Sequence, residues 1–299
     1  MLEILMAQID PNTAAREIEE GILKDVISSN ARGAVIGLSG GIDSTAVAYL
    51  AKRAFDRYNS ENNNLKLYGM ILPAEANNSA DEADAKRIAE LLGIEYHVVP
   101  IQPAIDTFAD MIPEYLSKDF DRANLASEIR ADIISRASAF RQGIMLNTGN
   151  KDEDHGIGYC TKRGDNLGDL APIAELPKRL VREVADYIGV PKDIVKREPT
   201  AGLSSGETDE KDLGYATAHN GIEKFKNLGT YDYIEIVTNA LDQGFFTKQI
   251  HEMTGFNIDV IKDIRHKHLY VAPHKNNVAP PSIPVTLEYE PLDWRLYEK

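Results

Sequence analysis

Residues 34–55 read AVIGLSGGIDSTAVAYLAKRAF, and this stretch decides how the chain folds. Residues 34–38 are apolar and predict a buried β-strand, whereas residues 44–57 have the apolar spacing of an α-helix. The turn between them is Ser39-Gly40-Gly41-Ile42-Asp43. In open α/β sheets, a ligand binds beyond the C-terminal end of the strand that enters such a turn. The stretch therefore predicts an α/β protein with a binding site at this turn.

The same alternation of strand and helix continues on both sides of this unit. Further strands are predicted at residues 67–72, 96–100 and 144–148, and helices at 12–30, 79–92, 124–142 and 177–189. Each crossover is long enough for a right-handed parallel connection. We therefore expect an α/β fold with a doubly wound, mostly parallel five-stranded sheet and helices on both faces. We expect a single domain over residues 1–299, with its core at about 12–230 and a C-terminal helical and extended, Pro-containing segment at about 231–299.

Composition and charge exclude several classes of protein. The chain has 299 residues with 47 acidic and 33 basic side chains, a net charge of −14, which argues against a nucleic acid as partner. A single cysteine, Cys160, cannot form an intramolecular disulfide, and the N-terminal residues lack a secretory pattern. No apolar run reaches the ~18 residues of a membrane span. These features predict a cytoplasmic protein without a membrane segment.

The chemistry of the turn at residues 39–44 indicates a nucleotide phosphate site. Gly40 and Gly41 allow the backbone to approach a phosphate closely, and Ser39 and Ser44 add hydroxyl donors. The carboxylate of Asp43 would repel phosphates unless a divalent cation lay between them, so the turn predicts a nucleotide with Mg²⁺. The plain alternative is an ordinary glycine-rich turn with helix-capping residues. The other common phosphate loop, G-x-x-x-x-G-K-[ST], is absent from the sequence.

The motif SGGIDS at residues 39–44 resembles that of the PP-loop (N-type) ATP pyrophosphatases, which have an adenine nucleotide alpha hydrolase-like fold. Members of that family release pyrophosphate from ATP and transfer AMP. Later motifs resemble those of the NAD synthetases, and they follow in the same order: TGNKDE at 148–153, GYCTKRGD at 158–165, PTAGL at 199–203 and GETDE at 206–210. The resemblance implies a ligase that forms a C–N bond. Its reaction would be amidation of nicotinic acid adenine dinucleotide (deamido-NAD) to NAD⁺ with ammonia, through an adenylylated carboxylate.

The same resemblance assigns roles to residues near ATP. It implies that Asp43 and Glu153 hold Mg²⁺ and that, with Lys178, they are the catalytic residues. The implied ATP-binding residues are Gly37, Ser39, Gly40, Gly41, Asp43, Ser44, Thr148, Lys178 and Thr200. Residues 200–212 resemble a segment that closes over the site. Without the resemblance, Asp152 and Glu153 would be read as a solvated acidic turn.

The residues expected to bind the acid substrate follow the family pattern less closely. The implied substrate-binding residues are Arg130, Lys162, Asp169, His266 and Lys267. Glu128 stands where the family has an arginine associated with the deamido-dinucleotide, and Arg163 replaces a tyrosine. A carboxylate cannot make the same contact to an anion. The alternative is therefore a PP-loop amide ligase that adenylates a different carboxylate metabolite.

The length of the N-terminal region bears on the nitrogen donor. Only about 33 residues precede the first strand of the turn unit, too few for an amidase domain, so we expect ammonia as direct donor, supplied free or by a separate glutaminase. The resemblance implies a homodimer, with residues 124–142 as a candidate contact. A tRNA-modifying enzyme is disfavoured by the negative charge and the missing catalytic cysteine pair. A non-catalytic nucleotide-binding regulator is disfavoured by Asp43, Glu153 and Lys178.

Overall fold

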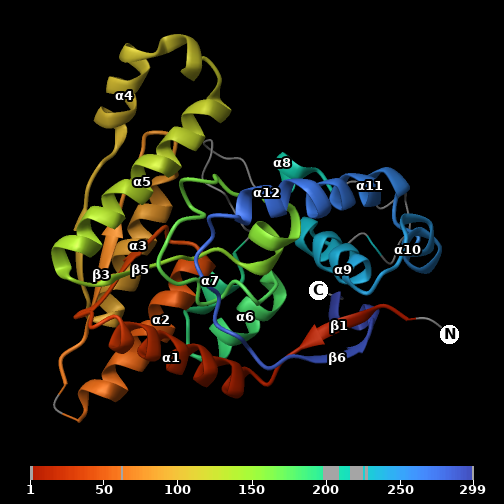
Figure 1. Cartoon of the computed structure of the whole chain (residues 1–299), viewed down its shortest axis with the longest axis horizontal. Helices are drawn as coiled ribbons and strands as arrows, with labels where there is room; N and C mark the ends of the chain where they lie inside the picture. The colour runs from red at the N-terminus through yellow and green to blue at the C-terminus, as the bar shows by residue number, and fades with distance from the viewer. Residues whose placement is uncertain (1–2, 62, 198–208, 216–224, 226–227, 298–299) are drawn as a thin grey trace.

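The computed structural model describes residues 3–61, 63–197, 209–215, 225 and 228–297, and its centre is a parallel β-sheet (Figure 1). The sheet has four strands in the order β4-β3-β2-β5. Their bounds are β2 (Gly33–Gly37), β3 (Lys66–Ile71), β4 (Glu95–Val98) and β5 (Ile144–Leu146). The predicted α/β class and parallel strand direction are confirmed. The predicted number of five strands is wrong for the described residues, where the parallel sheet has four. Only four segments of the sequence were assigned to strands, and no segment was assigned to a fifth.

Helices cover both faces of this sheet because its central strand is apolar on both sides. In β2, Ala34 and Ile36 lie in one hydrophobic cluster with α1 (Pro11–Ser28), α2 (Ile42–Asn59) and α3 (Ser79–Leu92). The intervening Val35 lies in another cluster with α4 (Gln102–Met111) and α5 (Asp119–Arg141). Alternate side chains of a strand point to opposite faces, so the two clusters lie on opposite sides. Each fully buried aliphatic side chain contributes ~1.5–3 kcal/mol to folding.

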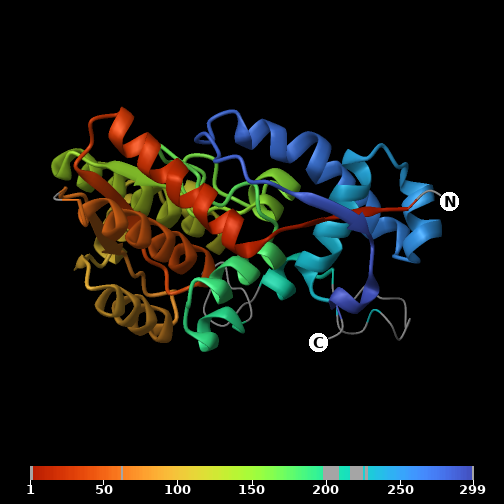
Figure 2. The ribbon, with the colours of Figure 1, turned by 90° about the horizontal axis from the view of Figure 1, so that it is seen from below.

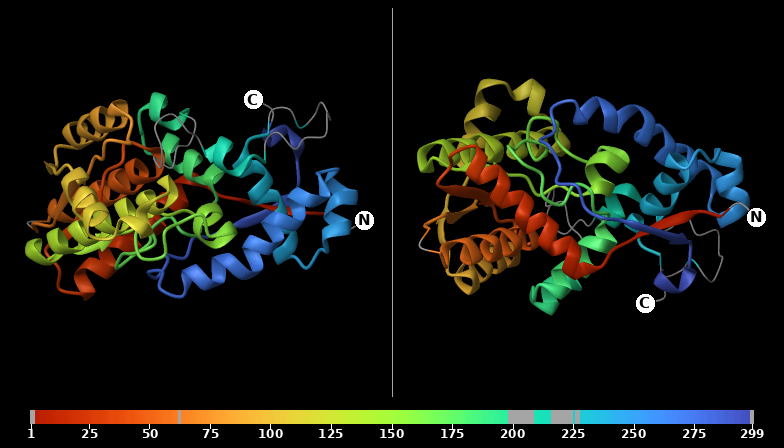
Figure 3. Two further views of the ribbon diagram at one scale, coloured as in Figure 1. Left: turned by 90° about the horizontal axis from the view of Figure 1, so that it is seen from above. Right: turned by 60° about the horizontal axis from the view of Figure 1, so that its bottom comes forward.

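A second group of helices lies beside the sheet unit (Figures 1 and 3). It consists of α9 (Thr230–Asp242), α10 (Thr247–Thr254), α11 (Ile258–His266), the π-helical η5 (Lys267–Val271) and α12 (Ala272–Asn276). These helices have their own hydrophobic cluster, centred on Tyr233 and Phe256, whose ring centroids are 4.5 Å apart. The expected C-terminal helical and extended segment is therefore present.

The two ends of the chain pair with each other, which the sequence did not predict. Strand β1 (Leu5–Gln8) lies antiparallel to β6 (Glu288–Pro291), and the two run side by side in Figure 2. The tail before β6 contacts α1, where Thr286 N donates to Glu17 Oε2 at 2.7 Å. This contact holds the tail against α1 in the sheet unit. The tail thereby connects the sheet unit to the C-terminal helices.

The elements between β5 and α9 are short and carry many of the predicted site residues. They are the π-helical η2 (Lys151–Ile157), α6 (Lys178–Tyr187), α7 (Lys192–Val195) and α8 (Asp209–Leu213); the remaining short helices are η1 (Pro113–Leu116) and η6 (Trp294–Tyr297). Within the described residues, no helix is both long and apolar enough to cross a bilayer.

Candidate active site

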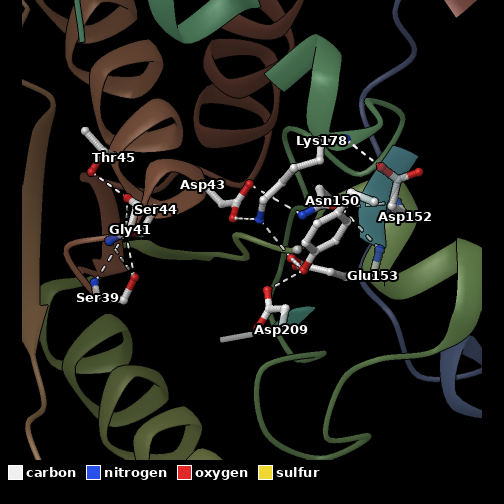
Figure 4. Close-up of polar contacts among 12 residues, drawn as sticks. Ser39, Gly41, Asp43, Ser44, Thr45, Asn150, Asp152, Glu153, Lys178 and Asp209 are labelled. Carbon is white, nitrogen blue, oxygen red and sulfur yellow. Dashed lines mark hydrogen bonds and ion pairs between the residues drawn. The ribbon is translucent and has the colours of Figure 1, made fainter. Parts of the chain in front are cut away.

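The turn after β2 presents backbone N–H groups and hydroxyls at the N-terminus of α2 (Figure 4). Gly41 is the N-cap residue of α2 and has no side chain with which to bond the first turn. The hydroxyls of Ser39 and Ser44 lie 3.0 Å apart, and Gly41 N donates to Ser39 Oγ at 3.2 Å. A helix N-terminus with free N–H groups and adjacent hydroxyls favours an anion such as phosphate.

Gly40 has a conformation that requires glycine. Its φ is +82°, and a Cβ atom at this position would lie 2.3 Å from the carbonyl oxygen of Asp81 in α3. Arg197 contacts both residues, because its Nη1 lies 3.5 Å from Gly40 O and 3.3 Å from Asp81 Oδ1. The turn is therefore held between α2, α3 and the residues after α7.

Lys178 joins the two predicted metal-binding carboxylates. Its Nζ lies 2.5 Å from Asp43 Oδ2 and 2.8 Å from Glu153 Oε1 (Figure 4). Asn150 orders the neighbouring turn, since its Oδ1 accepts from the backbone N–H groups of Asp152 and Glu153 at 3.1 and 3.2 Å. The three charged groups come from α2, η2 and α6, which only the fold brings together.

Burial and the neighbouring charges act in opposite directions on these groups. Burial raises the pKa of Asp43 above its ordinary value, although Lys178 opposes this effect. Burial also acts on Glu153, but the ammonium of Lys178 outweighs it and holds the pKa of Glu153 below its ordinary value. For Lys178, burial is outweighed by Asp43 and Glu153, so its pKa is raised. Lys178 thus remains charged at neutral pH, between two anions.

These groups line a cavity of about 370 Å³. Of the predicted site residues, its lining contains Gly37, Ser39, Gly41, Asp43, Ser44, Arg130, Thr148, Glu153 and Lys178. Gly40 shapes the turn without appearing in the lining. Thr200 lies outside the described residues, together with the rest of the range 200–208 of the segment expected to close over the site.

Four predicted substrate-binding residues do not line this cavity: Lys162, Asp169, His266 and Lys267. Asp169 Oδ2 accepts from Met145 N at 2.7 Å, so its carboxylate binds the backbone of β5. Lys267 Nζ contacts Asp263 Oδ2 at 2.8 Å and Tyr215 OH at 2.7 Å in the C-terminal helices. The ring of exposed His266 lies near that of Tyr270, with 5.4 Å between centroids.

Arg130 is the predicted substrate-binding residue that does reach the cavity. Its Nε donates to Leu72 O at 3.0 Å and its Nη2 donates to Asn77 Oδ1 at 2.7 Å. Burial lowers the pKa of this guanidinium. Glu128 and Arg163 are exposed and lie outside the cavity lining. The acidic replacement at residue 128 therefore does not place a negative charge in this cavity.

The alternative of a solvated acidic turn at residues 152–153 is wrong. Asp152 is 2% exposed, and its Oδ2 accepts from Lys178 N at 2.7 Å. Burial raises the pKa of Asp152 well above its ordinary value. The η2 turn is therefore packed into the site and fixes the start of α6. Cys160 is buried, and burial raises the pKa of its thiol, so it is a poor nucleophile.

Two residues of the site were not predicted as site residues from the sequence. Asp209 lines the cavity, and Tyr231 OH lies 2.6 Å from Asp209 Oδ2 and 2.6 Å from Glu153 Oε1. Asp209 belongs to the GETDE motif at residues 206–210, so a signal for it was present. Tyr231 lies in an apolar helix pattern that gives no such signal.

With this geometry in view, comparison with known proteins identifies the family. The family model described as NAD synthase matches residues 14–278. The chain belongs to the NAD synthase family. An NH(3)-dependent NAD(+) synthetase of Methanocaldococcus jannaschii is 33% identical over 84% of this chain and 92% of its own length. A second one, of Pyrococcus horikoshii, is 41% identical over 66% of this chain and 73% of its own length.

Solved structures of a synthetase for NMN and of one for NAD share the fold. The NMN synthetase of Francisella tularensis superposes with a TM-score of 0.74 at 27% identity, covering 92% of this chain and 99% of that one. The NH3-dependent NAD synthetase of Campylobacter jejuni has a TM-score of 0.65 at 24% identity, covering 87% and 94%. The latter similarity supports the α/β fold itself.

Proposed function

We propose that this protein catalyses the ATP-dependent amidation of nicotinic acid adenine dinucleotide to NAD⁺ with ammonia, releasing AMP and pyrophosphate. The observation that carries the proposal is the convergence of the phosphate turn, Lys178 and the carboxylates of Asp43 and Glu153 on one cavity. The names of the relatives in the NAD synthase family support the acid and the nitrogen donor.

The chemistry requires two bond exchanges. A carboxylate oxygen of the acid attacks the α-phosphorus of ATP, and the bond from that phosphorus to the pyrophosphate oxygen breaks. Ammonia then attacks the acyl carbon, loses a proton, and AMP leaves with the carboxyl oxygen. The N–H groups of the α2 N-terminus and the hydroxyls of Ser39 and Ser44 are placed to hold the departing pyrophosphate. Lys178 supplies a positive point charge for it.

The residues present fit Mg²⁺ at Asp43 and Glu153. Both carboxylates contact the same cation, the ammonium of Lys178, so their oxygens face one point. Among the described residues, no group of three or more His, Cys, Asp or Glu side chains is arranged for a metal, so phosphate oxygens and water would complete the coordination. When bound, Mg²⁺ would neutralise the charge between the phosphates and these carboxylates.

The direct test is an assay with purified protein, ATP, Mg²⁺, ammonium and nicotinic acid adenine dinucleotide. NAD⁺ and AMP are expected in equal amounts, and both should disappear when ammonium or the acid is omitted. Absence of NAD⁺ with no AMP formation would reject the proposal. AMP formation dependent on another acid would support an amide ligase of different specificity.

A second candidate is amidation of the corresponding mononucleotide acid to NMN. The superposition on the NMN synthetase of Francisella tularensis, which this chain covers over 99% of its length, favours it. The position of Lys162, Asp169, His266 and Lys267 outside the cavity of one protomer also leaves the second half of a dinucleotide without assigned contacts. A competition assay with equal concentrations of both acids separates the candidates by their kcat/KM ratio.

A homodimer is part of the proposal. Large apolar side chains are exposed on three consecutive elements that contact one another, α4, η1 and α5. We name them the apolar patch: Phe108, Met111, Tyr115 and Phe120. Exposed apolar surface of this kind commonly marks a protein interface. Phe120 also lines the cavity, so a second copy on this patch would cover the cavity edge.

The names of the relatives support ammonia as the direct nitrogen donor, and a separate glutaminase is the alternative supplier of that ammonia. A cytoplasmic location, predicted from the single cysteine, is also part of the proposal.

A further inference from the structure

Tyr231 lies behind the cavity wall and contacts three groups that form it. It is the second residue of α9 and is 7% exposed. Its hydroxyl lies 2.6 Å from Glu153 Oε1 and 2.6 Å from Asp209 Oδ2. The face of its ring lies under Lys178, with Nζ 4.9 Å from the ring centroid. One side chain therefore touches both ends of the Lys178–Glu153 ion pair.

The oxygen that Tyr231 contacts is the one that Lys178 uses. Glu153 Oε1 accepts from Lys178 Nζ at 2.8 Å and from Tyr231 OH at 2.6 Å. Hydrogen bonds to a charged acceptor are short and directional, so two of them fix the carboxylate in one orientation. The aromatic face attracts the ammonium from the other side. The distance between Glu153 and Asp43 is thus set partly by Tyr231.

Tyr231 is itself held rigidly. Gly229 caps α9, and its N–H donates to Asp232 Oδ2 at 2.7 Å. All residues from Thr230 to Ala240 are buried in the C-terminal helices. A group on the capped first turn of a buried helix has little freedom, which suits it to position other groups.

We propose that Tyr231 is a positioning residue that holds Glu153 and Lys178 in the geometry needed for a divalent cation and ATP, and that ties Asp209 to the same point. The inference rests on the proposed function. The Tyr231 hydroxyl has one proton, so it donates to Glu153 or to Asp209 at a given moment.

The test uses Tyr231→Phe, which keeps the ring and removes the hydroxyl. Binding of Mn²⁺ together with α,β-methylene-ATP, without acid or ammonium, is measured from the loss of the free Mn²⁺ signal by electron paramagnetic resonance. We expect the dissociation constant of Mn²⁺ to rise about tenfold, the effect of losing one hydrogen bond to a charged group. In the amidation assay, KM for Mg²⁺·ATP should rise while KM for the acid stays within about twofold.

The matched control is Tyr187→Phe, on the same helix as Lys178. Its hydroxyl donates to Asn12 Oδ1 at 2.8 Å, away from the cavity, so Mn²⁺ binding should not change. A double variant with Glu153→Gln provides the second measurement. If Tyr231 acts through Glu153, the double variant binds Mn²⁺ no more weakly than Glu153→Gln alone.

Two outcomes would overturn the inference. In the first, a Tyr231→Phe variant whose far-UV circular dichroism matches the wild type binds Mn²⁺ with the wild-type dissociation constant. In the second, the losses of Mn²⁺ binding free energy from Tyr231→Phe and Glu153→Gln add fully in the double variant. Failure of the proposed function is a separate result. Wild-type protein that binds Mn²⁺ with the nucleotide analogue but makes no NAD⁺ would refute the amidation while leaving the comparison of variants valid.

Discussion

Gly40 illustrates how one residue's conformation determines the shape of the phosphate turn. Its φ of +82° is unfavourable for side chains, and an added Cβ would meet Asp81 O at 2.3 Å. We expect Gly40→Ala to lower the free energy of unfolding by ~1 kcal/mol for the backbone conformation and ~1–3 kcal/mol more for the collision. It should also weaken ATP binding, because α3 or the turn must move. Urea unfolding and an ATP titration measure the two effects.

Gly189→Ala is the matched control for this substitution. Gly189 has a φ of +87°, but no atom lies within 4 Å of an added Cβ. The control should therefore show the backbone cost alone and normal ATP binding. Equal losses of stability in the two variants, with ATP binding unchanged in both, would show that the contact between the turn and Asp81 does not shape the site.

Asp43 tests the charge arrangement of the site. Asp43→Asn keeps the size of the side chain but removes the negative charge that faces Lys178 at 2.5 Å. Pyrophosphate release should fall by about 100-fold or more, because the charge would be needed to hold a divalent cation on ATP. A coupled pyrophosphatase assay measures it.

The control for Asp43 is Asp56→Asn on the same helix. Asp56 also pairs with a lysine, Lys52, at 2.6 Å, but its side chain is 61% exposed. A surface ion pair contributes little, so pyrophosphate release should stay normal. Full activity of Asp43→Asn would show that the metal assignment is wrong.

The site residues close to a recognisable motif could be predicted from the sequence. Asp43, Glu153 and Lys178 were expected together, and they meet at 2.5 and 2.8 Å. Tyr231 could not be predicted, because a tyrosine among apolar residues is typical of a helix core and its hydroxyl partners are distant in sequence. Asp169 was expected at the substrate, but its position in space shows a carboxylate bound to the backbone of β5.

Elements with local end signals were predicted well. Helix α3 spans Ser79–Leu92 as expected, since Asn78 caps its start and Gly93, with φ of +62°, ends it. The pairing of β1 with β6 was missed because the two strands lie at opposite ends of the chain and no local pattern relates them. The π-helical η2 has no helix signal in the sequence, because its Gly and Asp residues disfavour a regular helix.

The junction of η5 with its neighbours should make stability depend on pH. His268 Nδ1 lies 2.9 Å from Gly156 O and Nε2 lies 3.0 Å from Asp242 Oδ1, so the doubly protonated ring satisfies both acceptors. The hydrogen bond to Asp242 raises the pKa of His268 above its ordinary 6.5, although burial opposes it. A raised pKa means that the folded state binds the proton more tightly. This stability is complete below pH 6.5 and is lost as pH rises through the folded-state pKa.

His268→Gln removes this contribution. The difference in free energy of unfolding between wild type and variant should be largest below pH 6.5 and shrink as pH rises above it. His155 acts in the opposite direction, because desolvation lowers its pKa and its contribution is lost as pH falls below 6.5. This contribution is present in both proteins, so it cancels in the difference. Urea unfolding from pH 5.5 to 8.5 measures the difference. His274→Gln, an exposed position on α12, should follow the wild-type curve, and a His268→Gln difference that is constant with pH would contradict the assignment.

At the scale of the whole molecule, the site is assembled where two groups of helices meet. Asp43 and the phosphate turn come from the sheet unit, whereas Tyr231 comes from the C-terminal helices. The β1–β6 pair and the tail along α1 connect these groups. Such long-range assembly explains why sequence motifs identified the chemistry but not its supporting residues. The cavity lining contains the cationic side chains of Lys178 and Arg130, which anionic substrates need, together with a larger number of acidic side chains such as Asp43 and Glu153.

The apolar patch predicts that two copies of this acidic chain associate despite their like charge. Met111 is 70% exposed in the patch, and Met111→Glu should convert the dimer to a monomer, because a buried unpaired carboxylate at an interface is strongly unfavourable. Sedimentation velocity at several concentrations measures the mass. Phe246→Glu, at a similarly exposed apolar side chain (74%) just before α10 and outside the patch, should leave the dimer intact. The monomer should also have a lower kcat/KM for the acid, because Phe120 of the patch lines the cavity. A wild-type protein that sediments as a monomer at all concentrations would refute the interface.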